Sequence, residues 1–295
     1  MAIVVGLRPG QRNTAALHVA AELAEALGEP VLAACVIIVA PGVPSPLRVG
    51  MKDQDFAALI ASDVMAEARS VLGDALLDQF PLLARSVRAG LLELVSQEGS
   101  RHLVLGSAAG GEPGRVNVGD TAHSVLSSAS VPVHFAPAGY TGGDPSRPVR
   151  RLNVAFGADD ASRASLRFGA DLAHRVDGML RTVTFWVRQP TGASPLHGGM
   201  AYGAELSAQW HEQMTDTVDR AIRGLSELEL PSMWIDKVFG DGTDWAGAMA
   251  AVDWEPGDVL IVGSRPRGGL GGAFLGSRAA EILRHATVPT IVLPG

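Results

Sequence analysis

Cysteine is almost absent from this sequence of 295 residues, which contains Cys35 alone. One cysteine excludes an internal disulfide and any metal site built from several cysteines. Because Cys35 lies in an apolar run (residues 30–40), we expect an inert, buried thiol. No apolar run approaches the roughly 20 residues that a membrane span needs, and no signal-peptide pattern opens the sequence. We therefore expect a cytoplasmic protein without membrane contact.

The sequence also lacks an excess of positive charge and the common catalytic motifs. Its 24 Lys and Arg against 31 Asp and Glu give a net charge of −7. Proteins that bind nucleic acids usually carry a basic face, so we do not expect a nucleic-acid partner. The eight histidines form no H-x-x-x-H pair, and we expect no metal site. Neither a G-x-S-x-G elbow nor a G-x-x-x-x-G-K-[ST] loop occurs. A small-molecule α/β hydrolase is therefore only a remote alternative.

An internal repeat organises the chain. Three landmarks recur at one offset of 157 residues. The matching pairs are residues 103–107 with 260–264, Gly119 with Gly276, and residues 130–133 with 287–290. This period is too long for a solenoid and indicates a duplicated domain. A stretch rich in Gly and Pro (residues 138–148) is typical of a linker, so we predict domains at 1–138 and 149–295.

Short apolar runs alternate with helical patterns in both halves. We predict strands at residues 2–6, 30–40, 86–89, 103–106 and 131–136, and again at 152–156, 179–187, 233–239, 259–263 and 290–293. The predicted helices are residues 14–27, 54–80, 91–97, 120–127, 162–175, 204–229, 244–252 and 277–285. Such alternation indicates βαβ units. We therefore predict two doubly wound, mainly parallel five-stranded sheets in tandem, with helices on both faces and no single sheet through the chain.

The segment 259–295 carries the clearest chemical signal. A buried strand is followed by a loop rich in Gly and Arg, then by a helix that opens at Gly276 and Ser277. The start of such a helix offers free backbone N–H groups and a positive dipole end, which favour a phosphate. Arg265 and Arg278 add positive charge, and the Ser277 hydroxyl is a further donor. This segment therefore predicts an anion site.

This segment resembles the C-terminal signature of the universal stress protein family, in which a strand ends in Gly and a Gly-Ser or Gly-Thr pair follows at fixed spacing. Gly263 matches the first glycine, and Gly276 with Ser277 matches the final pair. The resemblance implies an adenine nucleotide alpha hydrolase-like fold and a non-catalytic stress-response protein. It also implies an ATP site in the second half. The residues assigned to that site are Val262, Gly263, Arg265, Gly276, Ser277 and Asp159.

Several positions depart from the family's pattern. Pro266 stands at the second signature glycine, and proline lacks an N–H donor. The aspartate that the family places after its first strand is replaced by Arg8 in the first half and Gly157 in the second. Gly106, Gly119 and Asp120 form the corresponding motif of the first half, where the Asp120 carboxylate would repel a phosphate. We therefore expect the first-half site to be degenerate and to stay empty.

The resemblance also leads to expectations about activity and assembly. We expect no enzyme, with weak ATPase activity at most, because no general base stands beside the phosphate site. The alternative is the same fold with both nucleotide sites lost, acting through dimerisation and contacts with unknown protein partners. We expect the last strands of the halves to pair, because an unpaired apolar edge promotes aggregation. The halves would then form a pseudo-dimer within one chain, and a further homodimer remains an expectation.

Overall fold

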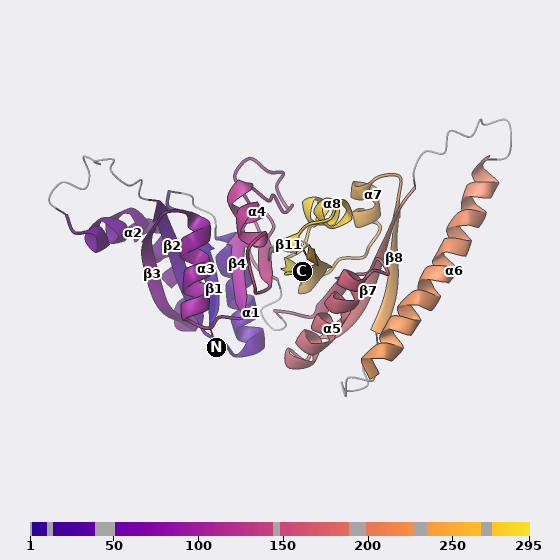
Figure 1. Ribbon diagram of the computed structural model, residues 1–295, viewed down its shortest axis with the longest axis horizontal. Coiled ribbons are helices and arrows are strands. Elements are labelled where there is room, and N and C mark those ends of the chain that lie inside the picture. The colour runs from indigo at the N-terminus through magenta and orange to yellow at the C-terminus, as the bar shows by residue number, and fades with distance from the viewer. Residues whose placement is uncertain are drawn as a thin grey trace.

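The computed structural model describes residues 2–10, 14–38, 51–143, 148–188, 199–226, 235–266 and 273–295, in which ten strands form one sheet (Figure 1). The first half contributes β1 (Ile3–Leu7), β2 (Val31–Ile38), β3 (Leu76–Ala84), β4 (His102–Gly106) and β5 (Val133–Ala136). The second half contributes β6 (Arg151–Ala155), β7 (Met179–Val187), β8 (Ile235–Gly242), β9 (Asp258–Gly263) and β12 (Thr290–Leu293). Two further short strands, β10 (Arg265–Pro266) and β11 (Ala273–Phe274), pair antiparallel in a small separate sheet.

Helices cover both faces of the large sheet (Figure 1). One face carries α3 (Val87–Gln97), α4 (Asp120–Leu126), α7 (Trp245–Ala250) and α8 (Ser277–His285), and their buried side chains share one apolar core that continues from the first half into the second. The other face carries α1 (Ala15–Leu27) and α2 (Asp53–Leu72) in the first half, and α5 (Asp160–Arg175) and α6 (Gly199–Ser226) in the second. On this face each half has its own apolar core.

The strand order confirms the predicted fold class. The order is β3-β2-β1-β4-β5 in the first half, and the second half repeats it as β8-β7-β6-β9-β12. Strands within each half run parallel, as crossover helices on both faces require. The expected pairing of the last strands is present as an antiparallel ladder between β5 and β12. This ladder joins the two halves into one ten-stranded sheet, so the expectation of two separate sheets is wrong.

The same hydrogen bond occurs at matching positions of the two halves. The Ser107 hydroxyl donates to the carbonyl oxygen of Ala136 at 2.8 Å. In the second half the Ser264 hydroxyl donates to the carbonyl oxygen of Leu293 at 2.6 Å. Each serine thus ties the end of a central strand to the end of the last strand. The Gly-Ser pair of the repeat therefore has a structural role in both halves.

The third strand of the first half differs from the prediction. The predicted helix 54–80 ends as α2 at Leu72, where Gly73 adopts a φ of +50°. A left-handed φ favours glycine and is incompatible with continuing the helix. A short 3-10 turn and β3 follow, so residues 76–80 belong to a strand. The predicted strand 86–89 is also wrong, because the Ser86 hydroxyl caps the start of α3 by accepting from the Ala89 N–H at 3.1 Å.

Other predicted elements agree with the structure to within a few residues, apart from ends that fall outside the described ranges. The predicted strand 233–239 corresponds to β8, with 233–234 outside the described residues. The predicted helix 204–229 corresponds to α6, with 227–229 outside them. The domain bounds 1–138 and 149–295 stay predictions.

A buried group of charges lies at the amino ends of β6 and β9. The fully buried Asp258 carboxylate accepts from Arg151 Nε at 2.6 Å and Nη2 at 2.7 Å, and it lies 3.6 Å from Arg181 Nη2. The backbone N–H of Glu255 also donates to it at 2.8 Å. Burial lowers the pKa of Arg181, whereas hydrogen bonding to Asp258 raises the pKa of Arg151. Asp258 therefore holds two guanidinium groups that little water reaches.

Two buried histidines lie beside the junction of the halves. His102 Nδ1 on β4 is 3.0 Å from His134 Nε2 on β5, and His134 stands opposite Ile291 in the β5–β12 ladder. Both side chains are almost completely buried. Burial lowers the pKa of His102 to about 4 and holds the pKa of His134 well below its usual value. Both rings are therefore neutral in the folded protein near pH 7.

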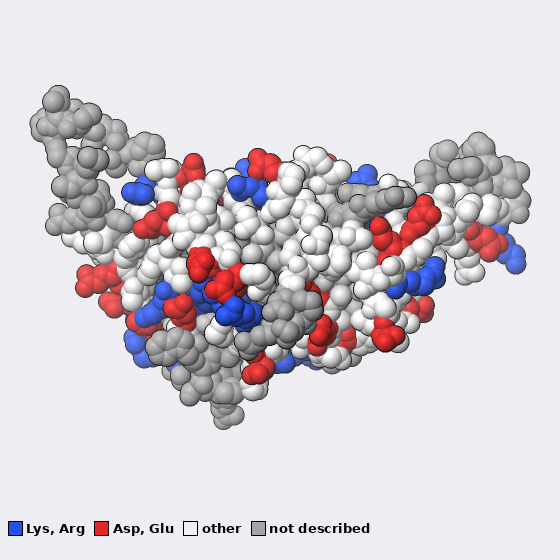
Figure 2. All heavy atoms as spheres, turned by 180° about the vertical axis from the view of Figure 1, so that it is seen from behind, with Lys and Arg blue, Asp and Glu red and all other residues white. Residues whose placement is uncertain are grey.

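Cys35 lies within β2 and is buried, as expected. Burial raises the pKa of its thiol to about 11, so little reactive thiolate forms at neutral pH. On the face shown in Figure 2, acidic and basic side chains of the described residues are interspersed. Among the helices of the described ranges, none combines the length and the hydropathy that crossing a membrane requires.

Candidate functional site

Each half has a cleft beyond the carboxyl ends of its strands, where open α/β sheets bind their ligands. The first cleft, lined by β1, β2, β4, α2, α3 and the start of α4, has a volume of about 430 Å³. The second cleft, lined by the ends of β6, β7 and β9 and the starts of α5 and α8, has a volume of about 180 Å³. Small-molecule sites usually occupy roughly 300–1,000 Å³. The first cleft falls within this range and the second does not.

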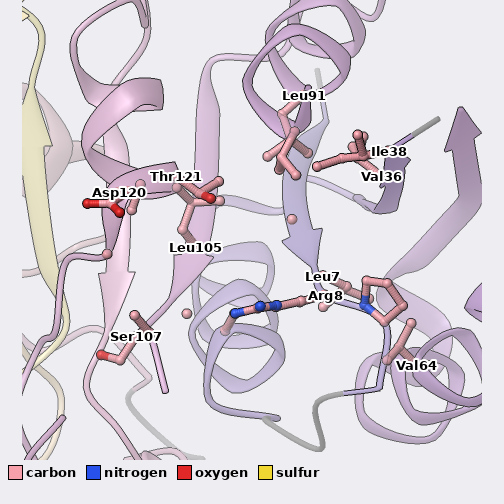
Figure 3. Close-up of a pocket in the computed structure, with 18 of the residues that line it drawn as sticks. Leu7, Arg8, Val36, Ile38, Val64, Leu91, Leu105, Ser107, Asp120 and Thr121 are labelled. Carbon is pink, nitrogen blue, oxygen red and sulfur yellow. The ribbon is translucent and has the colours of Figure 1, made fainter. Parts of the chain in front are cut away.

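An apolar wall and a polar side form the first cleft (Figure 3). The apolar side chains labelled in Figure 3 are those of Leu7, Val36, Ile38, Val64, Leu91 and Leu105. From the end of β1, the Arg8 side chain runs across the cleft in the direction of Ser107. Thr121 lies on the cleft side at the start of α4, whereas the neighbouring Asp120 carboxylate points away from Arg8. The three residues predicted for this half, Gly106, Gly119 and Asp120, all line this cleft.

The polar groups of the first cleft differ in how they are engaged. The Ser107 hydroxyl donates to Ala136 O and accepts from the Asn117 N–H at 3.1 Å, so backbone groups already use it. Among the described residues, neither Arg8 nor Asp120 has a hydrogen bond or an ion pair, and both are exposed. The first cleft therefore offers a guanidinium and a carboxylate that do not neutralise each other.

The second cleft brings together five of the six residues predicted for the nucleotide site: Asp159, Val262, Gly263, Gly276 and Ser277. The sixth, Arg265, pairs with Phe274 between β10 and β11. The side chains of Arg265 and Pro266 lie outside what the structure describes. Asp159 caps α5, since its carboxylate accepts from the Ser162 N–H at 2.9 Å and from the Ser162 hydroxyl at 2.5 Å.

Arg278 crosses the second cleft, which the sequence analysis did not foresee. Its Nη2 donates to the carbonyl oxygen of Phe185 at 2.6 Å. A Cβ placed on Gly157 would lie 3.6 Å from Arg278 Nη1, so the guanidinium lies close to the end of β6. Burial lowers the pKa of Arg278, and the nearby Asp159 carboxylate opposes that shift. The second cleft is therefore partly filled by the protein's own cation.

The repeat accounts for the difference in volume between the clefts. At the offset of 157 residues, Thr121 in the first half corresponds to Arg278 in the second. Because β1 and β6 pair with β2 and β7 in the same register, Val36 corresponds to Phe185. Both positions carry the larger side chain in the second half. The first of these differences, Thr121 against Arg278, could be read from the repeat in the sequence, whereas the second needs the strand register of the structure.

We expect Gly263→Ala to destabilise the protein by about 1–3 kcal/mol, because overpacking forces backbone shifts. A Cβ at Gly263 would lie 2.6 Å from Ala161 O and 2.7 Å from Ser165 Oγ, both on α5. Gly224→Ala in α6 is the control, since nothing lies within 4 Å of its Cβ position and alanine favours a helix. Urea unfolding measures both variants. Equal stability of Gly263→Ala and the wild type would show that packing against α5 does not require a glycine here.

A strand order that recurs in the two halves, with a cleft at the strand ends of each half, defines a doubly wound α/β protein. The sequence model of the Universal stress protein family matches residues 148–294. Universal stress proteins of Mycobacterium tuberculosis (strain H37Rv) and Mycobacterium bovis are each 32% identical over 300 residues and cover 100% of both chains. The chain belongs to the universal stress protein family.

Solved structures agree on the fold. A universal stress protein from Archaeoglobus fulgidus DSM 4304 has a TM-score of 0.59 at 14% identity and covers 98% of this chain and 97% of its own. A functionally unknown protein from Pseudomonas aeruginosa PAO1 has a TM-score of 0.55 at 17% identity, covering 99% and 92%. The Archaeoglobus fulgidus universal stress protein solved in complex with dAMP covers 46% of this chain and 97% of its own, at 19% identity and a TM-score of 0.34, too low for a comparison of sites.

Proposed function

We propose that this chain is a non-catalytic stress-response protein that binds an adenine nucleotide, such as ATP, in the second cleft. The proposal rests on the convergence of Gly276, Ser277 and Arg278 at the ends of β6 and β9. In ATP-binding members of the family, the signature glycines and the hydroxyl residue hold phosphates and ribose. Asp159 caps α5 through its hydrogen bonds to Ser162. A contact between Asp159 and a bound nucleotide stays a prediction.

The charges of the second cleft favour a phosphate. The helix α8 has nine residues and no acidic residue in its first turn, so its positive end is not neutralised. Arg278 follows directly, and its guanidinium now donates to a neutral carbonyl oxygen. A phosphate is the stronger acceptor, because it carries negative charge and can accept two parallel hydrogen bonds from one guanidinium. Since the cleft holds only about 180 Å³, we infer that a nucleotide exchanges the contact between Arg278 and Phe185 for one with phosphate.

The second cleft has the chemistry of a binding site more than that of an active site. Among the described residues that line it, the one acidic side chain is Asp159, which already accepts two hydrogen bonds. No histidine or lysine appears among those lining residues. A water that attacks phosphate needs an oriented acceptor or a base. We therefore propose that any ATPase activity is weak.

Titration calorimetry with ATP tests this proposal. We expect binding to the wild type and its loss in Gly276→Asp and Ser277→Asp, which place the negative charge of Asp120 in the second half. Coulomb repulsion at about 4 Å costs roughly 1–4 kcal/mol at the effective dielectric of a protein surface, or about fivefold to several hundredfold in affinity. Asp160→Asn, a change at an exposed position of α5, is the control and should bind ATP as the wild type does. Unchanged affinity in both aspartate variants would place the nucleotide elsewhere.

The alternative is that both nucleotide sites are lost and that the protein acts through protein contacts alone. The arginine that fills the second cleft favours this alternative, and an absence of heat with ATP would support it. We also propose that the halves act as an intramolecular pair, on the basis of the β5–β12 ladder. A homodimer and other protein partners stay expectations.

A further inference from the structure

The ten-stranded sheet has two open edges, β3 and β8, which lie at opposite ends of the molecule (Figure 1). Because β5 and β12 pair at the centre, no strand of the described ranges lies beyond β3 or β8. An edge strand presents unpaired N–H and C=O groups, which can pair with a strand of another molecule. β3 has nine residues and β8 has eight, which suffices for such pairing. The two edges are therefore surfaces on which copies of this chain could join.

The strand geometry shows which N–H groups face outward. Backbone groups two residues apart in a strand point to the same side. Proline lacks an N–H and is tolerated in a sheet where that N–H would face solvent, so Pro81 and with it the Gln79 N–H point outward from β3. The Gly242 carbonyl oxygen accepts from the Arg188 N–H, just after β7, at 2.9 Å. Gly242 therefore faces β7, and the Lys237 N–H, an odd number of residues earlier, points outward from β8.

An aspartate caps one of these outward N–H groups on each edge. Asp78 Oδ1 accepts from the Gln79 N–H at 2.7 Å. In the second half Asp236 Oδ1 accepts from the Lys237 N–H at 2.9 Å. The two caps stand at equivalent places, because following the strand register outward from β4 and β9, which match in the repeat, leads to Asp78 in one half and Asp236 in the other. The cap is therefore common to two edges whose other residues differ, since β3 reads LLDQFPLLA and β8 reads IDKVFGDG.

β3 carries two further obstacles to pairing. Its register on β2 shifts near its start, so Leu77 has no partner there and is 64% exposed. Such a bulge twists an edge away from an approaching strand, and Pro81 removes a second outward N–H. β8 pairs with β7 in continuous register and contains no proline. The Asp236 cap therefore matters more to β8 than the Asp78 cap does to β3.

We propose that Asp78 and Asp236 cap the open edges of the sheet and keep copies of this chain from joining edge to edge. A strand that approaches either edge must displace the carboxylate or leave its own ladder group unpaired, which is unfavourable. Displacement also brings an aspartate charge out of water against the incoming backbone. The protection matters because contact of β3 with β8 of the next copy is head-to-tail and can continue from copy to copy. This inference concerns assembly and goes beyond the proposed function, since it stands whether or not a nucleotide binds.

Sedimentation velocity of the full chain over a range of protein concentrations tests the proposal. We expect Asp236→Ala to raise the association constant at least about tenfold over the wild type, because the uncapped Lys237 N–H can pair with a second copy. Asp171→Ala is the matched control, because it removes the same charge at an exposed position of α5 and should sediment as the wild type does. Asp78→Ala should have a smaller effect, since the bulge and Pro81 remain. The double variant Asp78→Ala and Asp236→Ala should form species that grow with concentration.

Two further variants separate the cap from charge alone. Asp236→Asn keeps an oxygen that can accept from the Lys237 N–H, so it should stay close to the wild type. Lys237→Pro in Asp236→Ala protein removes the N–H and should reverse the association. Association of Asp236→Asn equal to that of Asp236→Ala, or wild-type behaviour of Asp236→Ala and the double variant, would overturn the proposal. So would a wild-type oligomer that Lys237→Pro dissociates, because the capped edge would then already be in use.

Discussion

Asp258→Ala is expected to lower the free energy of unfolding by about 3–5 kcal/mol, the usual cost of removing one partner from a buried ion pair. The Asp258 carboxylate is completely buried, and the side chains of Arg151 and Arg181 around it are only 12% and 5% exposed. Without this carboxylate, Arg151 would keep its ion pair with Glu255 at 3.2 Å. Among the described residues, the buried Arg181 would keep only neutral acceptors, the side-chain oxygen of Asn153 and the carbonyl oxygen of Asp253. Urea unfolding of the full chain, followed by circular dichroism, measures the change.

The matched control for this result is Asp219→Ala. Asp219 pairs with Lys237 at 2.8 Å, but both side chains are about one third exposed. Exposed pairs contribute about 0–1 kcal/mol, so this variant should unfold almost as the wild type does. A loss of less than about 1 kcal/mol for Asp258→Ala as well would show that water reaches the buried group.

Acid is expected to destabilise the protein between about pH 6.5 and pH 4 through His102 and His134. The unfolded chain binds protons on these rings near pH 6.5, whereas in the folded protein the pKa of His102 is about 4 and that of His134 is well below 6.5. Since the unfolded state binds more protons in this window, stability is fully present above pH 6.5 and is lost as the pH falls. The shift of His102 alone corresponds to roughly 3 kcal/mol.

The double variant His102→Asn and His134→Gln tests this prediction. Asn places an amide near the Nδ1 position and Gln near the Nε2 position, so a hydrogen bond can persist without a titrating ring. We expect the stability of the variant to fall by roughly 3 kcal/mol less than that of the wild type between pH 7 and pH 4. His174→Asn, at an exposed position of α5, should keep the wild-type dependence.

Other charged groups near the pair affect both proteins alike. Arg101 and Arg175 disfavour protonation of His102 through their positive charge. Glu22 lines the small cavity beside His134. Burial raises the pKa of Glu22, so its titration acts in the opposite direction. All three remain in the double variant, and the comparison therefore isolates the histidines. Identical pH profiles of the two proteins would show that the rings titrate normally when folded.

The sequence predicted the fold well wherever an apolar run in one half recurred at the same offset in the other half. The last two strands of each half are apolar runs at one offset, and parallel strands buried on both faces produce such runs. The prediction failed at β3 because a single residue, Gly73, ends the preceding helix. The sequence analysis also predicted two separate sheets while expecting the last strands to pair. These two expectations are incompatible, because the pairing of two end strands necessarily makes one sheet.

The candidate site was predictable in its residue types but not in its shape. The signature spacing predicted that Gly263, Gly276 and Ser277 lie together, and the structure places all three on the second cleft. Spacing alone does not say where a long side chain lies. The Arg278 guanidinium occupies the space that the signature led us to expect for a ligand. The first cleft was missed because its apolar wall comes from five separate elements with no common motif.

The β5–β12 ladder lies between two unequal halves of one polypeptide. If two identical chains met through such a ladder, symmetry would give both clefts the same residues, and every substitution would appear twice. Covalent fusion removes that constraint and makes the pairing independent of protein concentration. Thr121 and Arg278, or Asp120 and Ser277, can therefore differ within one molecule. The chain is in effect a permanent heterodimer, in which the residues of one cleft can change without a matching change in the other.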